Sequence, residues 1–164
     1  MIRYSLSTAG LALAGALAVV GVAGATSPAS KQRIAINVTI RPGAAPNGTF
    51  ELTPLNPGLI ARDSGSITSV DPVETHGVRD GQAFTRFPRT TTTFTGKNGT
   101  LVIREDQYVV SASRGISVDT ATWIVIRGTG AYKRVRGKGR QASVLSEAAT
   151  TPYPIRYEGM LTSP

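Results

Sequence analysis

Hydrophobic and polar residues alternate along several stretches of this chain. The clearest stretch is 33–41, in which every second residue is a branched apolar one: Ile34, Ile36, Val38 and Ile40. An alternation with a period of two is typical of a β-strand with one buried face. The segment 153–162 alternates in the same way near the end of the chain. Outside residues 1–25 no segment shows the 3.6-residue period of a helix, so the sequence predicts an all-β fold.

Turn residues divide the rest of the chain into short strand candidates. Further strands are predicted at 49–53, 59–62, 65–70, 90–95, 100–105, 116–127 and 141–145. Tight turns are predicted at Asp63-Ser64-Gly65, at Asp80-Gly81 and at Gly96-Lys97-Asn98-Gly99, because Gly and Asn tolerate the backbone angles of hairpin turns. About eight strand signals at this spacing predict an antiparallel sandwich or barrel.

The segment 123–127 is apolar at both parities of a predicted strand. Trp123 and Val125 would face one side, and Ile124 and Ile126 would face the other. A strand that is apolar on both sides is covered on both sides. Either the loops of the same chain or another subunit could supply the outer cover, so a homo-oligomer is one of two open alternatives.

Residues 1–25 have the three-part pattern of a secretory signal peptide. A short start containing Arg3 precedes the apolar run 11–22, and Ala23-Gly24-Ala25 follows it. Because a membrane-spanning helix needs about 20 apolar residues, we expect cleavage after Ala25 rather than a membrane anchor. The expected product is a secreted protein with no stable membrane span, a flexible leader at 26–32 and one β-domain at 33–164.

The composition constrains how that domain is held together and where it comes from. The chain contains no cysteine, so a secreted domain must be stabilised by packing alone. This lack of cysteine, together with many Ala, Arg, Thr and Val residues, is typical of a bacterial protein. Lys and Arg number 18 against 10 Asp and Glu, which makes the protein basic.

Much of the excess positive charge lies in the segment 133–140. Four cations share one parity there and would lie on one face of a strand: Arg134, Arg136, Lys138 and Arg140. Outside a cell such a face could bind wall polymers, anionic lipid headgroups or released nucleic acid. A solvated face that keeps the protein soluble is the simpler interpretation of the same pattern.

No set of residues in the sequence points to catalysis. His76 is the single histidine, and one histidine without cysteine cannot supply the usual zinc ligands or readily form a Ser-His-Asp triad. Phosphate-binding and dinucleotide-binding motifs are missing as well, so we expect no metal and no cofactor. The candidates for lining an interior cavity are Arg104, Tyr108 and Trp123, and alternation alone does not decide whether Arg104 or Glu105 points inward.

Several short motifs from residue 49 onward carry a resemblance to a known superfamily. They are Phe50-Glu51-Leu52-Thr53-Pro54-Leu55, Asp63-Ser64-Gly65, the segment 94–101, the segment 123–130 with Tyr132, Gly137 and Gly139, and Tyr157-Glu158-Gly159. In these motifs the chain resembles small secreted bacterial proteins related to the allene oxide cyclase and dirigent barrels. The resemblance implies an eight-stranded antiparallel barrel, often trimeric in the plant members, whose cavity steers the stereochemistry of reactive intermediates. No functional residue of those families is matched here.

These observations lead to three hypotheses about function. The favoured one is a secreted, non-catalytic β-barrel that binds a small apolar ligand or an extracellular partner. The second is a cyclase or dirigent-type protein that steers a reactive intermediate in the barrel cavity. The third is polyanion binding through the basic segment 133–140.

Overall fold

The computed structural model describes residues 31–43, 48–71, 73–112, 115–146 and 151–163. The elements within these ranges are β1 (Lys31–Ile40), β2 (Gly48–Pro54), β3 (Asp63–Val70), β4 (Thr75–Arg79), β5 (Gln82–Gly96), β6 (Gly99–Ser111), β7 (Ile116–Gly128), the short 3-10 helix η1 (Gly130–Tyr132), β8 (Arg136–Ser146) and β9 (Tyr153–Thr162). The strands form one sheet in the order β3-β2-β1-β9-β8-β7-β6-β5-β4, and every neighbouring pair is antiparallel.

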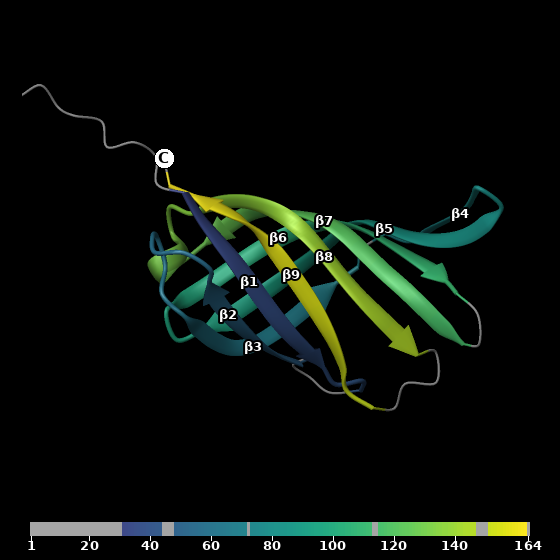
Figure 1. The fold of residues 1–164 in the computed structure, drawn as a ribbon, viewed down its shortest axis with the longest axis horizontal. Coiled ribbons are helices and arrows are strands. Elements are labelled where there is room, and N and C mark those ends of the chain that lie inside the picture. The colour runs from purple at the N-terminus through teal and green to yellow at the C-terminus, as the bar shows by residue number, and fades with distance from the viewer. Residues whose placement is uncertain (1–30, 44–47, 72, 113–114, 147–150, 164) are drawn as a thin grey trace, which may run out of the picture.

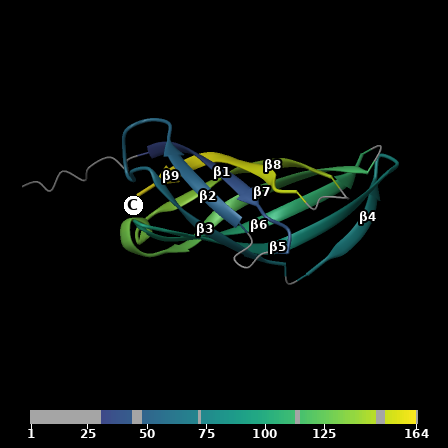
Figure 2. The same cartoon turned by 90° about the horizontal axis from the view of Figure 1, so that it is seen from below.

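The long strand β5 closes this sheet into a barrel. Its second half, residues 91–96, pairs with β3, whereas its first half, residues 82–86, pairs with β4. Eight strands therefore form a closed antiparallel barrel, which confirms the predicted all-β barrel. The ninth strand, β4, forms with β5 a hairpin that extends away from the rest of the barrel (Figures 1 and 2). Closure satisfies the backbone groups that an open sheet would leave at its edges.

The predicted turns show where local sequence signals are sufficient. The turn at Asp80-Gly81 is confirmed, and both residues have positive φ, 52° and 77°. The turn predicted at 63–65 is wrong, because Asp63 begins β3, and the strand predicted at 59–62 is not formed. The Asp63 carboxylate instead accepts the backbone N–H groups of Lys97 and Asn98, at 2.9 and 3.3 Å. A contact with the β5–β6 turn therefore overrides the local turn signal.

The first strand begins at Lys31, two residues before the predicted start of the domain. The Gln32 side chain is buried and bonds to the loop between β2 and β3. Its Nε2 donates to the carbonyls of Asn56 and Ile60, both at 3.0 Å, and its Oε1 accepts from the N–H of Ile60 at 2.9 Å. Because both ends of the amide are satisfied, the residue is stable inside the barrel. The predicted signal peptide, its cleavage site and the leader residues 26–30 lie outside the described residues.

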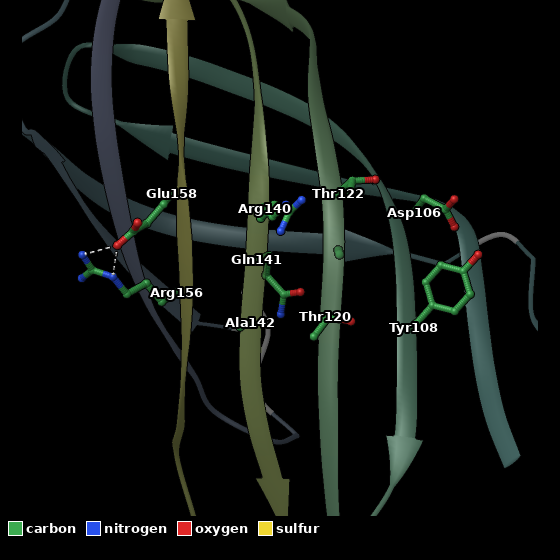
Figure 3. A pocket seen from close by; sticks show the side chains of 10 residues that line it. Asp106, Tyr108, Thr120, Thr122, Arg140, Gln141, Ala142, Arg156 and Glu158 are labelled. Carbon is green, nitrogen blue, oxygen red and sulfur yellow. Dashed lines mark hydrogen bonds and ion pairs between the residues drawn. The ribbon is translucent and has the colours of Figure 1, made fainter. Parts of the chain in front are cut away.

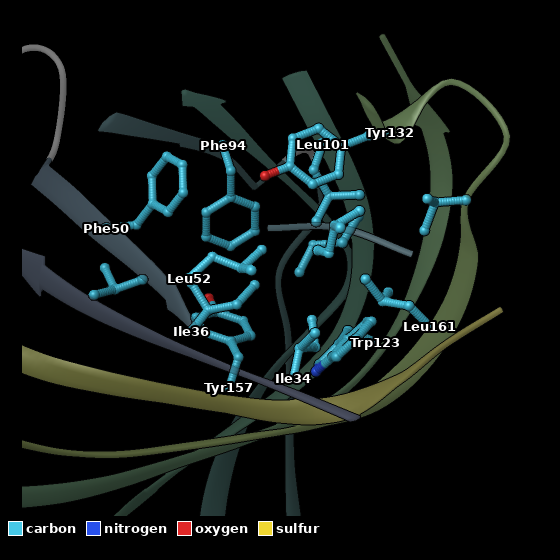
Figure 4. Close-up of a cluster of buried hydrophobic side chains, with 14 of the residues drawn as sticks. Ile34, Ile36, Phe50, Leu52, Phe94, Leu101, Trp123, Tyr132, Tyr157 and Leu161 are labelled. Atoms are coloured by element: carbon cyan, nitrogen blue, oxygen red, sulfur yellow. The ribbon is translucent and has the colours of Figure 1, made fainter. Parts of the chain in front are cut away.

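One half of the barrel interior is filled by apolar side chains. We call the end that holds the β5–β6 turn the closed end, and the opposite end the mouth. The buried cluster reaches from the closed end to the middle of the barrel and consists of Ile34, Ile36, Val38, Phe50, Leu52, Ile60, Ile67, Phe94, Leu101, Ile103, Trp123, Tyr132, Val135, Tyr157 and Leu161 (Figure 4). The ring of Phe94 packs edge-on against the rings of Phe50 and Tyr157, at 5.3 and 5.6 Å. Such a filled interior is common in barrels of eight strands.

Gly139 of the basic segment and Gly159 of β9 make room for the indole ring of Trp123. Gly139 on β8 pairs with Trp123 on β7 and with Gly159 on β9. A Cβ atom would lie 2.5 Å from the indole at Gly139 and 2.3 Å from it at Gly159, which is too close for any side chain. Since residues alternate along β8, the glycines face the interior and the cations between them face outward.

Candidate functional site

The mouth half of the barrel interior is polar and contains two buried carboxyl groups. Glu105 on β6 is 3% exposed, and Asp119 on β7 is 1% exposed. Both line an interior cavity of about 180 Å³. The other lining residues are Ile40, Ser69, Asp71, Thr90, Thr92, Gln107, Leu145, Tyr153, Ile155 and Tyr157. Of the described residues that line the cavity, none is Lys or Arg, so the site is acidic.

Glu105 is held by two hydroxyl groups, one from the neighbouring strand β5 and one from β9. The hydroxyls of Thr92 and Tyr157 donate to the same oxygen, Oε1, the second at 3.4 Å. Burial raises the pKa of Glu105 to about 7, the hydrogen bond from Thr92 opposes this rise, and the charge of Asp119 adds to it. At neutral pH the carboxyl group is therefore present in both its protonated and its ionised form. Burial also raises the pKa of Tyr157 well above its ordinary value, so this hydroxyl remains a donor.

Asp119 accepts three hydrogen bonds, all on one oxygen. The donors to Oδ2 are Gln107 Nε2 at 2.9 Å, Gln141 Nε2 at 2.8 Å and Ser143 Oγ at 3.3 Å. Burial raises the pKa of Asp119, and these hydrogen bonds oppose the rise. The second oxygen, Oδ1, is buried and accepts no hydrogen bond from any described residue, and the same is true of Oε1 of Gln141. A buried acceptor without a donor is costly, and this one belongs to a residue that lines the cavity.

A third carboxylate lies at the rim of the cavity. Asp71 follows β3 and is exposed, and its Oδ1 accepts a hydrogen bond of 2.5 Å from the hydroxyl of Thr90 on β5. Its charge contributes to the raised pKa values of both Glu105 and Asp119. The negative potential of the site therefore extends from the buried carboxyl groups to the opening.

Only one of the three residues predicted to line a cavity lies inside the barrel. Trp123 is buried, but it packs in the closed end and donates from Nε1 to the carbonyl of Arg140 at 3.1 Å. Arg104 is exposed on the outer face of β6, and Tyr108, at the same parity, also lies on the outer side. The structure places these two residues outside the barrel, because alternation that puts Glu105 inside puts both of them outside. Asp119 was missed, although it has the same parity on β7 as the buried Trp123.

Tyr108 instead lines a groove of about 680 Å³ on the outer face of β6 to β9. Figure 3 shows the short side chains of its floor, Thr120, Thr122 and Ala142, between Asp106 with Tyr108 on one side and Arg156 with Glu158 on the other. Both carboxylates of the groove are in ion pairs, to Arg86 and Arg156, each with a closest approach of 2.8 Å. The groove is larger than the interior cavity, but its two carboxylates are already paired.

The predicted polyanion-binding residues lie on the outside, away from the buried carboxyl groups. Arg136, Lys138 and Arg140 are exposed along β8, and Arg134 is exposed just before that strand. Three of the four cations, Arg136, Lys138 and Arg140, thus share the outer face of β8, whereas Arg134 lies in the turn before this strand. His76 lies on the projecting β4, where its Nε2 is 3.3 Å from the carboxylate of Glu74 and the side chain is 72% exposed.

Neither a family model nor a curated or solved protein matches this chain. Within the described ranges, no three His, Cys, Asp or Glu side chains are grouped so that they could hold a metal ion. None of the described helical segments is long and apolar enough to cross a membrane.

Proposed function

We propose that the protein is a β-barrel that binds a small, donor-bearing ligand at its mouth, between Asp119 and Glu105. The observation that carries this proposal is the buried Oδ1 of Asp119, which accepts no hydrogen bond from the described residues. A hydrogen-bond donor of the ligand would complete this acceptor, as the few polar groups of a ligand pocket commonly do. A cavity of about 150 Å³ can hold one benzene molecule, so the 180 Å³ of this cavity suits a ligand of about one ring.

The lining of the cavity indicates which chemical class of ligand fits. The carboxyl groups of Glu105, Asp119 and Asp71 favour an ammonium group or another cationic donor. The apolar residues Ile155 and Leu145 line the same cavity and could pack against an apolar ligand body. We therefore replace the wholly apolar ligand expected from the sequence by a small amphipathic amine. Secretion, and the signal peptide on which it rests, remain part of the proposal.

The proposal is tested by screening one-ring primary amines, with matched alcohols and carboxylic acids, by ligand-observed NMR. We expect binding by amines and not by acids. The variant Asp119→Asn should weaken amine binding at least tenfold, because it removes the charge while keeping the shape of the side chain. The matched control is Asp106→Asn, which changes a carboxylate of the outer groove. If both variants bind the amines as the unchanged protein does, the mouth cavity is not the binding site.

A second candidate function is acid–base steering of a reactive intermediate, as the resemblance to allene oxide cyclase and dirigent barrels suggests. The observation that favours it is the pKa of Glu105, about 7, because a general acid or base works best near the ambient pH. The hydroxyl of Tyr157, beside the same carboxyl group, could donate to an oxygen that gains negative charge. Glu105 would then take up or release the proton, and the cavity walls would select one face of the intermediate.

This second candidate is tested with short-lived epoxides that cyclise spontaneously. We expect the protein to convert a racemic product mixture into one with an enantiomeric excess, and Glu105→Gln to abolish the excess. The control is Glu158→Gln, which changes an exposed carboxylate on β9. A racemic product in the presence of the unchanged protein would exclude steering of these intermediates. It would not contradict the proposal that the cavity binds amines.

A further inference from the structure

The outer face of the barrel near the closed end carries cations interleaved with exposed apolar side chains. The strand registers place five residues side by side in one row across β6, β7, β8, β9 and β1: Arg104, Ile124, Lys138, Met160 and Arg33. All five side chains are exposed. The row thus brings together residues that are up to 127 positions apart in the sequence.

The row continues toward the closed end with the same composition. Arg136 on β8 and Lys31 on β1 both pair with Thr162 of the intervening β9. Ile126 and Arg127 are exposed at the end of β7. We call the whole surface the cationic face and define it by Lys31, Arg33, Arg104, Arg127, Arg136 and Lys138 together with Ile124, Ile126 and Met160.

Acidic side chains do not neutralise the cationic face. None of the residues that define it is acidic, and the outer face carries its first acids two residues further along the strands. These acids, Asp106 and Glu158, are already in ion pairs with Arg86 and Arg156. The positive charge of the face is therefore available to an external anionic partner.

Large apolar side chains are exposed on the same surface. Ile124 and Ile126 are 42% and 44% exposed, and Met160 is 36% exposed. Leu55, 45% exposed, borders the face, because its backbone N–H donates to the carbonyl of Arg33 at 2.8 Å. The sequence predicts that Ile124 and Ile126 are covered from outside. The structure leaves both side chains exposed, so within the described residues they offer apolar surface to a partner.

We propose that the cationic face docks the protein on a membrane surface rich in anionic phospholipids. The Lys and Arg side chains would contact the headgroups, and the exposed Ile and Met side chains would enter the boundary between headgroups and acyl chains. A soluble polyanion fits the same face less well. Nucleic acid would call for aromatic side chains that stack on bases, and the nine residues of the face include none. Extended wall polymers would leave the isoleucines uncovered.

The role of charge is tested with vesicles of phosphatidylcholine with and without phosphatidylglycerol. The full chain is mixed with each vesicle type, and binding is measured by flotation at low and at high salt. We expect the phosphatidylglycerol in the vesicles to strengthen binding and salt to weaken it. The variant Arg33→Glu, Arg104→Glu, Lys138→Glu should bind about 100-fold more weakly or worse. A matched control changes two arginines and one lysine elsewhere, by Arg62→Glu, Arg79→Glu and Lys97→Glu, and should bind like the unchanged chain.

The role of the apolar side chains is tested with a second pair of variants. Ile124→Thr with Ile126→Thr keeps β-branched residues in the strand and removes apolar surface. We expect about tenfold weaker vesicle binding and unchanged retention of single-stranded DNA. The matched control is Val118→Thr with Val144→Thr, a cross-strand pair that is also exposed but lies outside the cationic face.

Three outcomes would overturn the proposal. The first is vesicle binding that does not depend on phosphatidylglycerol or on the three cations. The second is tight binding of single-stranded DNA or of an anionic wall polymer by a protein that does not bind the vesicles. The third is a homo-oligomer that dissociates when Ile124 and Ile126 are replaced, which would identify the face as a subunit interface.

Discussion

The hydroxyl of Tyr132 donates a hydrogen bond of 2.8 Å to Oδ2 of Asp63, a residue 69 positions earlier in the chain. The other oxygen of the same carboxylate accepts the backbone N–H groups of Ser64 and Lys97, both at 2.9 Å. One buried side chain thereby joins the start of β3, the β5–β6 turn and the short helix η1. Because an ionised carboxylate is costly to bury without donors, this arrangement ties the closed end of the barrel together.

Replacing Tyr132 by Phe should destabilise the protein by about 1–3 kcal/mol, because the Asp63 carboxylate then loses a buried donor. The free energy of unfolding, measured by urea denaturation, checks this. The control is Tyr108→Phe on the outer face, which we expect to change stability by less than about 0.5 kcal/mol. Equal stability of the two variants would show that the hydroxyl of Tyr132 does not hold the closed end.

Replacing Gly159 by Ala should destabilise the barrel by about 1–3 kcal/mol, because the added Cβ would lie 2.3 Å from the indole of Trp123. Combining it with Trp123→Phe should cost less than the sum of the two single changes, since the smaller ring leaves room for the methyl group. Urea denaturation of the four proteins of this cycle measures the coupling. Strictly additive effects would contradict a direct clash between the two side chains.

The stability of the barrel should fall as the pH rises from about 4.5 to about 7. The ordinary pKa of a glutamate is 4.5, and burial raises the pKa of Glu105 in the folded protein to about 7. Between these values the unfolded chain ionises while the folded one stays protonated, so ionisation favours unfolding. The decrease is at most roughly 3 kcal/mol, and it is complete above pH 7.

The measurement is the free energy of unfolding as a function of pH for the unchanged protein and for Glu105→Gln. The variant should show a shallower decline over this interval, because it has no carboxyl group at this position. What decline remains should come from Asp119, whose pKa burial also raises. Glu158→Gln serves as the control and should follow the unchanged protein. A decline of the same depth in Glu105→Gln would mean that another group causes it.

Replacing Gln32 by Leu should destabilise the barrel by about 2–4 kcal/mol. The apolar side chain would fit the interior, but the N–H of Ile60 and the carbonyl groups of Asn56 and Ile60 would lose their partner. Urea denaturation measures the effect, with the exposed Gln82→Leu as control. Unchanged stability would place the start of the folded domain after residue 32, as the sequence suggests.

The sequence predicts an element correctly where the pattern of residues close together in the chain is enough to define it. The alternation that begins at Ile34 predicts β1, and Asp80-Gly81 predicts the β4–β5 turn. The prediction at 63–65 fails because Asp63 has the composition of a turn but serves as an acceptor for a turn more than 30 residues away. Likewise, β5 begins before its predicted start, because its first half pairs with β4 across the Asp80-Gly81 turn.

The candidate site could be predicted only in part. Alternation places Arg104 and Glu105 on opposite faces of the strand, but it does not say which of them faces the interior. Leu101, Val102 and Ile103 are all buried, so the alternation does not show which face is internal. A bulge in the β6–β7 pairing also follows Val102. Barrel closure decides the direction, because it brings the hydroxyl of Tyr157, 52 residues away, next to the carboxyl group of Glu105.

The sequence by itself determined the all-β class, the hairpin at Asp80-Gly81, the long strand around Trp123 and the outward row of cations on β8. These features depend on the backbone preferences and polarity of residues close together in the chain. The tertiary structure alone decided which face of β6 is internal, how β5 divides its pairing and that Asp119 keeps an acceptor without a donor among the described residues. Those features depend on contacts between strands distant in sequence, which form only when the sheet closes into a barrel.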